Sequence, residues 1–206
     1  MTQIGLPLDW PVNEENDGFI VTAANRRAVQ FLDGWGRWPV AAALLTGPRK
    51  SGRSLLGRIF QNKSGGRVID NAERYDEQRV FHAWNDAQEH RRPLLIIADV
   101  PPPQWQVSLP DLRSRFAATP VASLGDPDEA LIAELFGKLL RQRGLGVTPE
   151  VLRYLAARME RSHVNVIRMV DAMDDISLSQ NRAITIPLAR QVLTSIGVMS
   201  YDTQDT

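Results

Sequence analysis

Hydrophobic residues along the first part of the chain occur in short runs separated by segments of helical periodicity. Short apolar runs are typical of buried parallel strands, and we assign four of them, at 39–46, 67–70, 93–99 and 120–124. Three segments have apolar side chains at helical spacing or begin with residues typical of helix starts, at 25–35, 52–62 and 76–91. Strands that alternate with helices predict a parallel sheet covered by helices.

The pattern becomes purely helical after this part of the chain. Asp128 precedes a run in which apolar residues share one helical face, and aspartate is a favoured N-cap residue. Thr148 followed by Pro149 is typical of the start of another helix. Two further helices are expected at about 163–179 and 187–196.

These patterns divide the chain into three parts. Residues 1–17 are polar, contain two prolines and show no periodicity, which predicts a flexible tail. Residues 18–125 are predicted to form an α/β core, and residues 126–206 a small all-helical domain.

The composition narrows the class of protein. The 206 residues include 24 basic and 24 acidic side chains, and this balance argues against a dedicated nucleic-acid-binding domain. No apolar run is long enough to cross a membrane, and no secretory signal is visible. The chain has no cysteine and only three scattered histidines, so disulfides and zinc chemistry are not expected. These features fit a cytoplasmic protein.

The segment "LLTGPRKSGRSLL", residues 44–56, has the spacing of a phosphate-binding loop between a strand and a helix. Gly47 and Gly52 would let backbone N–H groups approach an anion, and Ser54 is a candidate ligand of Mg²⁺. Arg53 stands where such loops carry lysine, so it keeps the charge but not the shape. The loop predicts binding of ADP or ATP with Mg²⁺, or else a glycine turn without a ligand.

Three more polar residues are candidates for the same chemistry. Asp70 ends the strand of "RVIDN" and is a candidate second ligand of Mg²⁺, or part of an ordinary polar turn. Asp99 ends the strand of "PLLIIAD" and either senses a phosphate or caps the proline turn that follows. Arg115 in "LPDLRSRF" is a candidate arginine finger, although a single arginine on a short helix is usually solvated or salt-bridged.

Four segments together resemble the AAA+ proteins related to the replication initiator DnaA, in particular the shorter Hda type. They are "FIVTAANRRA" at 19–28, "GPRKSGRS" at 47–54, "IADVPPPQWQVSLPDLRSRF" at 97–116 and "RAITIPLARQVL" at 182–193. The resemblance implies a P-loop AAA+ core with a short parallel sheet, followed by a helical lid. It also implies that Asp99 is the sensor 1 aspartate and that Arg115 acts in trans on the nucleotide of DnaA.

The tail carries a second resemblance. "QIGLPL" is similar to the hexapeptide with which replication proteins dock on the DNA polymerase III β sliding clamp. Gln3 would be the polar anchor, Leu6 and Leu8 would fill apolar pockets, and Pro7 would stiffen the peptide. Hda-type proteins, bound to ADP and to the DNA-loaded clamp, stimulate ATP hydrolysis on DnaA and so prevent re-initiation. AAA+ relatives associate through arginine-finger faces, so a homodimer is a further expectation.

The chain departs from the family pattern in ways that affect nucleotide binding. The segment between Ser54 and Asp70 is too short for the strand and helix that the family usually has there, so a smaller sheet is expected. Asn165 falls on the position of the sensor 2 arginine, and Arg168 follows one helical turn later. With Arg53 in the loop, these changes predict weak or absent nucleotide binding and no efficient intrinsic ATPase.

Two alternatives remain at this point. A small P-loop kinase or NTPase acting on a nucleoside or metabolite would need the loop lysine and arginines clustered near the phosphates, whereas the lid arginines here lie along amphipathic helices. The AAA+ body could also be only the scaffold of a clamp-binding protein. No segment after the lid is long enough for the DNA-binding domain of DnaA, so DNA contact is expected only through the clamp.

Overall fold

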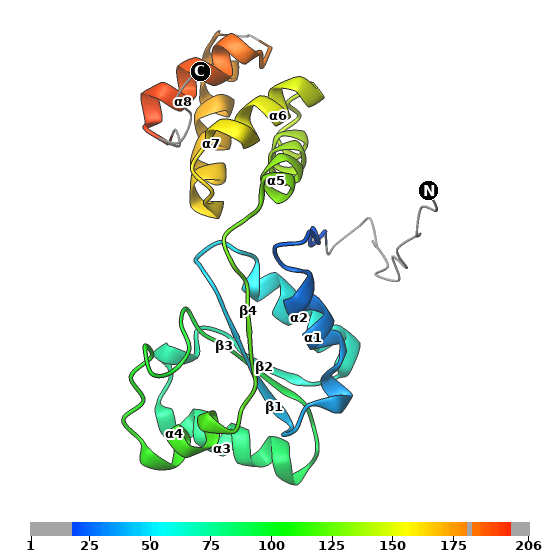
Figure 1. Cartoon of the computed structure of the whole chain (residues 1–206), viewed down its shortest axis with the longest axis vertical. Helices are drawn as coiled ribbons and strands as arrows, with labels where there is room; N and C mark the ends of the chain where they lie inside the picture. The colour runs from blue at the N-terminus through cyan, green and yellow to red at the C-terminus, as the bar shows by residue number, and fades with distance from the viewer. Residues whose placement is uncertain (1–17, 181–182, 199–206) are drawn as a thin grey trace, which may run out of the picture.

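The computed structural model describes residues 18–180 and 183–198. Its centre is a four-stranded parallel sheet in the order β2-β3-β1-β4 (Figure 1). The strands are β1 (Ala42–Thr46), β2 (Arg67–Ile69), β3 (Leu94–Ile97) and β4 (Val121–Ser123). Each strand lies within one of the four apolar runs, so this part of the sequence prediction is confirmed.

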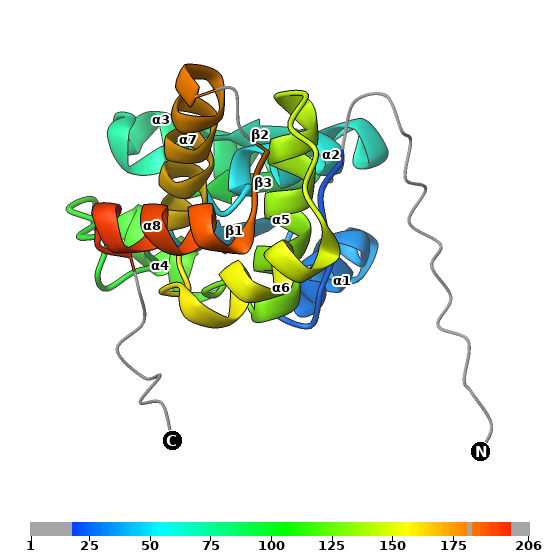
Figure 2. The same cartoon turned by 90° about the horizontal axis from the view of Figure 1, so that it is seen from above.

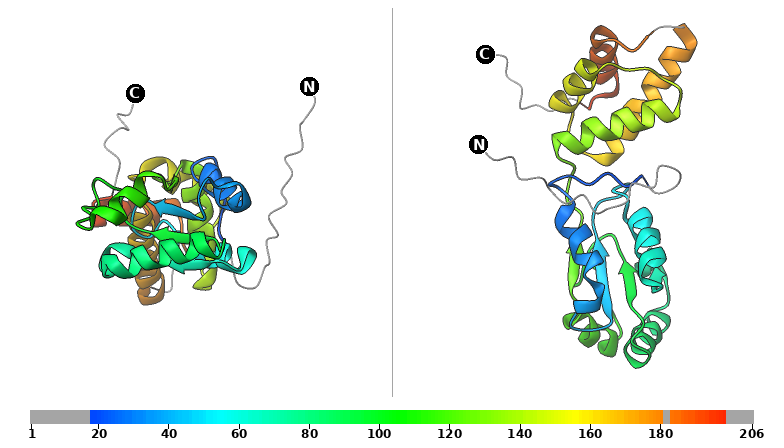
Figure 3. Two further views of the ribbon diagram at one scale, coloured as in Figure 1. Left: turned by 90° about the horizontal axis from the view of Figure 1, so that it is seen from below. Right: turned by 90° about the vertical axis from the view of Figure 1, so that its right-hand side faces the viewer.

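Helices cover both faces of the sheet, which explains why the strands are apolar throughout rather than alternating. One face packs against α1 (Arg26–Asp33) and α2 (Arg53–Ser64), and the other against α3 (Glu77–Glu89) and α4 (Pro110–Ala117) (Figure 3). Leu44 and Ile96 point towards α3 and α4, whereas Leu45 and Ile97 point towards α1 and α2. Two short 3₁₀ helices, η1 (Trp35–Arg37) and η2 (Ala72–Arg74), complete the core.

The connection from α2 to β2 confirms the expected smaller sheet. Helix α2 ends at Ser64 and β2 begins at Arg67, so only two glycines separate them. Gly65 ends the helix with φ 65°, and its N–H donates to the carbonyl of Gln61. A positive φ at a helix C-terminus favours glycine. The chain therefore turns directly from the helix into the strand, without a further strand between them.

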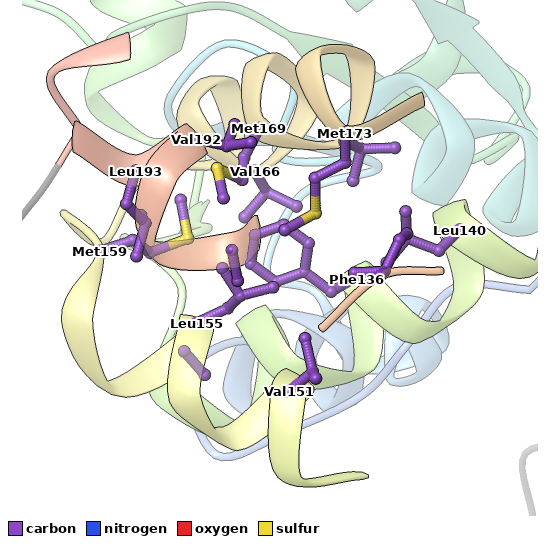
Figure 4. Packing of buried hydrophobic residues seen from close by; sticks show 14 of the residues in the cluster. Phe136, Leu140, Val151, Leu155, Met159, Val166, Met169, Met173, Val192 and Leu193 are labelled. Carbon is purple, nitrogen blue, oxygen red and sulfur yellow. The ribbon is translucent and has the colours of Figure 1, made fainter. Parts of the chain in front are cut away.

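The helical region after β4 forms its own hydrophobic core. It consists of α5 (Glu129–Gln142), α6 (Pro149–Arg158), α7 (His163–Gln180) and α8 (Ile186–Ile196). Phe136 is fully buried at its centre, with side chains of α6 and α7 around the ring (Figure 4). Figures 1 and 2 place these helices over the carboxyl ends of the strands, as a lid on the core.

Asp128 connects the lid to the segment before α1. Its Oδ1 accepts a hydrogen bond of 2.8 Å from the N–H of Leu131, which confirms it as the N-cap of α5. Its Oδ2 accepts a second one of 3.1 Å from the N–H of Ala24. One carboxylate therefore starts the first lid helix and holds that helix against the core.

Across the described ranges, every helix is too short or too polar to span a membrane.

Candidate functional site

The loop between β1 and α2 has a backbone that requires glycine at two positions. Gly47 has φ 149°, and a Cβ there would lie 2.6 Å from the carbonyl oxygen of Leu124. Gly52 has φ 89° and directly precedes α2, and a Cβ there would lie 2.9 Å from the ring of Phe19. Both glycines are therefore explained by close packing as well as by backbone conformation.

A cavity of about 200 Å³ lies between this loop and the lid. Its walls are mainly apolar and come from three parts of the chain, namely the segment before α1, the loop with α2, and the lid helices α5 and α7. They include Phe19, Ile20, Leu55, Leu131, Leu135, Leu139, Val166 and Ile167. An apolar cavity between two structural layers is a typical place for a small-molecule ligand.

Two buried polar atoms at this cavity have no hydrogen-bond partner within the protein. They are the Oγ of Ser51, in the loop, and the Nδ1 of His163, at the start of α7. Leaving a buried polar atom unpaired costs about 1–3 kcal/mol, so a ligand with polar groups at these positions would be favoured.

Two lysines add positive charge to the same cavity. Lys50 lies in the loop, and Lys138 lies on α5 of the lid. The ammonium group of Lys138 donates to the carbonyl of Gly18, across the opening between lid and core. Sequence reasoning missed both lysines, as it missed Ser51 and His163. Lys50 and Ser51 occupy variable positions inside the loop motif, and Lys138 and His163 lie on lid helices that carry no motif.

The loop arginine and the expected sensor aspartate contact each other. The guanidinium of Arg53 forms an ion pair with the carboxylate of Asp99 and donates to the carbonyl of Ala98. The Arg53 side chain is only 10% exposed, whereas that of Asp99 is 46% exposed. The structure therefore brings these two predicted site residues together, with Arg53 turned to the end of β3 rather than to the cavity.

The two candidate Mg²⁺ ligands lie at the carboxyl edge of the sheet. Ser54 is exposed in the first turn of α2, and Asp70 follows β2 directly. The Asp70 carboxylate accepts a hydrogen bond of 2.9 Å from the N–H of Asn71. Within the ranges that the structure describes, no three acidic or histidine side chains gather as a metal site.

The residue at the sensor 2 position, Asn165, and the arginine one turn later, Arg168, form hydrogen bonds to other residues of the lid. Asn165 is buried, and its amide donates to the carboxylate of Glu160 at 2.9 Å. Arg168 donates to Asn165 at 3.4 Å and to the carbonyl of Ile196 at 3.5 Å. Neither residue lines the cavity. The assignment of Asn165 to the sensor 2 position stays a prediction from the sequence.

Arg115 lies near the end of α4, a helix that Figure 1 shows on the side of the core away from the lid helices. Its guanidinium stacks over the rings of Trp84, 5.1 Å from the centroid, and Phe81, 5.8 Å from the centroid. Its Nε donates to Asn85 Oδ1 at 3.3 Å. Such cation–π contacts restrict the orientation of the side chain. Arg115 is therefore half-buried and held in place by three residues of α3.

The four residues of the predicted clamp motif, Gln3, Leu6, Pro7 and Leu8, lie outside the described residues. Their role stays a prediction from the sequence.

Burial lowers the pKa of His163 below its ordinary value of 6.5, and the nearby Asp126 carboxylate opposes this only in part. The other charged groups that line the same cavity are Lys50 and Lys138. Because the unfolded chain binds this proton more readily, stability is full above the unfolded pKa and falls below it. We therefore expect the free energy of unfolding to decrease as the pH drops below about 6.5.

Urea denaturation between about pH 7.5 and about pH 5.5 measures this effect. His163→Gln is expected to flatten the pH dependence of the free energy of unfolding, because it removes the imidazole whose charged form is disfavoured by burial. His82→Gln is the matched control, since His82 is exposed on α3 and its replacement should leave the slope unchanged. Equal slopes for the wild type and His163→Gln would contradict the assignment.

Comparisons with known proteins agree with this geometry. Residues 132–193 match the family described as the Hda lid domain. Domain III of the Thermotoga maritima replication initiation protein DnaA is similar in structure, with a TM-score of 0.70 and 17% identity over 86% of this chain and 94% of that chain. The RuvB Holliday junction branch migration motor of T. maritima has a TM-score of 0.61 and 15% identity over 82% of this chain and 67% of that chain.

A replication initiator DnaA bound to AMPPCP and single-stranded DNA is also similar, with a TM-score of 0.57 and 14% identity over 79% of this chain and 66% of that chain. With its parallel sheet, phosphate loop and helical lid, the chain has the AAA+ fold. Over residues 132–193 the lid is in addition similar to the Hda lid domain, and the fold of the whole is similar to that of DnaA domain III.

Proposed function

We propose that this protein regulates the initiation of DNA replication by promoting ATP hydrolysis on DnaA while it is docked on the sliding clamp. The observation that carries the proposal is the position of Arg115 in a chain with an Hda-type lid. A half-buried arginine held by aromatic rings, on a helix at the far side of the core from the carboxyl ends of the strands, is suited to act on a neighbouring molecule.

The chemistry proposed for Arg115 is electrostatic. During hydrolysis of ATP, negative charge spreads over the transferred phosphoryl oxygens, and a cation placed there stabilises the transition state. Because the guanidinium already stacks on Trp84 and Phe81, it would lose little conformational entropy on docking. Arg115 would therefore act in trans, with no covalent chemistry and no proton transfer of its own.

The protein's own nucleotide would have a structural role. The cavity and its unpaired atoms on Ser51 and His163 favour a bound base or sugar, and Lys50 with the backbone at Gly52 favours phosphate. Ser54 and Asp70 would hold Mg²⁺ together with phosphate oxygens, and the ion would supply neutralisation of the phosphate charge. Arg53 and Asn165 supply no cation to the cavity, which favours ADP as a resting ligand over efficient hydrolysis.

Docking on the clamp is assigned to the tail. We expect the wild-type protein to bind the purified β sliding clamp at micromolar or tighter affinity, through Gln3, Leu6 and Leu8. Combined Gln3→Ala, Leu6→Ala and Leu8→Ala should weaken binding about 100-fold or more, because it removes the polar anchor and both apolar side chains of a short motif.

Surface plasmon resonance with immobilised clamp measures this difference. Asn13→Ala in the same tail, outside the motif, is a matched control that should bind like the wild type. If the wild-type protein does not bind the clamp, the docking part of the proposal is wrong, and a ligand search at the cavity becomes the better course.

A further inference from the structure

The contact between Arg53 and Asp99 has a consequence for the affinity of the phosphate loop. Arg53 is placed by sequence at the position from which such loops reach a phosphate, directly at the start of α2. In the structure its guanidinium is instead shared between the Asp99 carboxylate and the Ala98 carbonyl, and the side chain is 10% exposed. The donors that a phosphate would use are therefore occupied by the protein itself.

Asp99 is held in position by hydrogen bonds of both its backbone N–H and its backbone carbonyl. Its N–H donates to Glu73 Oε1 at 3.2 Å, and its carbonyl accepts from the N–H of Gly47 at 3.3 Å. The second carboxylate oxygen of Glu73 is buried and has no hydrogen-bond partner. Two carboxylates thus lie at the end of β3 beside the first glycine of the loop, and their negative charge disfavours an incoming anion.

We propose that Asp99 competes with phosphate for Arg53 and so lowers the affinity of this loop for nucleotides. The inference rests on the proposed nucleotide site and reverses the role expected for a sensor aspartate, since removal of the Asp99 charge should strengthen binding. Charge-assisted hydrogen bonds of a guanidinium to an anion are strong and directional. Transfer of Arg53 from the carboxylate to a phosphate therefore changes the affinity measurably.

The test is equilibrium binding to the full-length protein, followed by isothermal titration calorimetry. Asp99→Asn removes the charge and keeps the size of the side chain, and we expect it to bind ADP with Mg²⁺ about tenfold more tightly than the wild type. Pyrophosphate affinity should rise by a similar factor. Adenosine affinity should stay unchanged, because adenosine has no phosphate for Arg53 to contact.

A second pair of variants shows whether the effect passes through Arg53. In the Arg53→Ala background, Asp99→Asn should change the affinity for ADP by about twofold or less. The reason is that this background lacks the guanidinium that Asp99→Asn would free to bind phosphate. Circular dichroism of each variant checks that it is folded. An increase of the melting temperature with ADP, larger for Asp99→Asn than for the wild type, gives an independent readout of the same binding.

Three results would overturn the inference: Asp99→Asn binds ADP no more tightly than the wild type, it gains equally in the Arg53→Ala background, or neither protein binds ADP at millimolar concentration. These results are separate from the proposed function. Stimulation of DnaA depends on Arg115 and the clamp, so retained stimulation together with unchanged ADP affinity would contradict the inference alone. Tighter ADP binding without any stimulation of DnaA would contradict the proposed function alone.

Discussion

Arg115→Ala is expected to reduce the stimulation of ATP hydrolysis on DnaA by about a thousandfold, the lower end of the range for an arginine finger. Alanine removes the guanidinium that is proposed to reach the phosphoryl oxygens on the neighbouring molecule. The measurement is the rate of conversion of ATP to ADP on DnaA, with this protein and the DNA-loaded clamp present. Binding to the clamp should be unchanged, because the tail carries it.

Arg113→Ala provides the matched control for this variant. Arg113 lies on the same helix, is exposed, and donates to the carbonyl of Ser108 at 3.2 Å. We expect it to stimulate hydrolysis within about twofold of the wild type. Because Arg115 also bonds to Asn85, the folding of its variant must be checked by denaturation. A folded Arg115→Ala protein with full stimulation would exclude this residue as the finger.

Phe136→Ala is expected to lower the free energy of unfolding of the lid by about 3–5 kcal/mol. The ring is fully buried in the single apolar cluster that joins all four lid helices, so alanine leaves a cavity at its centre (Figure 4). Since α5 also forms one wall of the ligand cavity, a partly unfolded lid should lose ADP binding as well. Urea denaturation followed by circular dichroism measures the change.

Leu178→Ala is the control that removes an exposed apolar side chain of the lid instead of a buried one. Leu178 lies on α7 of the same lid but is 74% exposed, so its replacement should cost less than about 0.5 kcal/mol. Similar destabilisation by both variants would mean that the cluster around Phe136 is not the main stabilising core of the lid.

Most of the fold follows from local patterns in the sequence. The runs around Leu44 and Ile96 are apolar at every position because helices cover both faces of the sheet, and continuous runs of this kind are predictable. Asp128 was predictable as an N-cap because its carboxylate acts within one helical turn. The direct step from Ser64 to Arg67, and with it the smaller sheet, followed from the length of the connecting segment.

Within the candidate site, only the residues that belong to local sequence motifs were predictable. The glycines of the loop follow a spacing that the sequence shows, and Arg53 and Asp99 each belong to such a segment. Their contact does not, because it joins the start of α2 to the residue just after β3, and these are adjacent only in the folded chain. Lys138 and His163 come from lid helices without any motif. Their position depends on how the lid packs over the core, which periodicity alone cannot specify.

The most direct test of the central claim is the rate of ATP hydrolysis on DnaA in the presence of the wild-type protein, with and without clamp loaded on DNA. We expect a large acceleration with the loaded clamp and little without it, since the tail would bring Arg115 to DnaA at high local concentration. The same low rate of hydrolysis with and without this protein, at concentrations that saturate the clamp, would contradict the account.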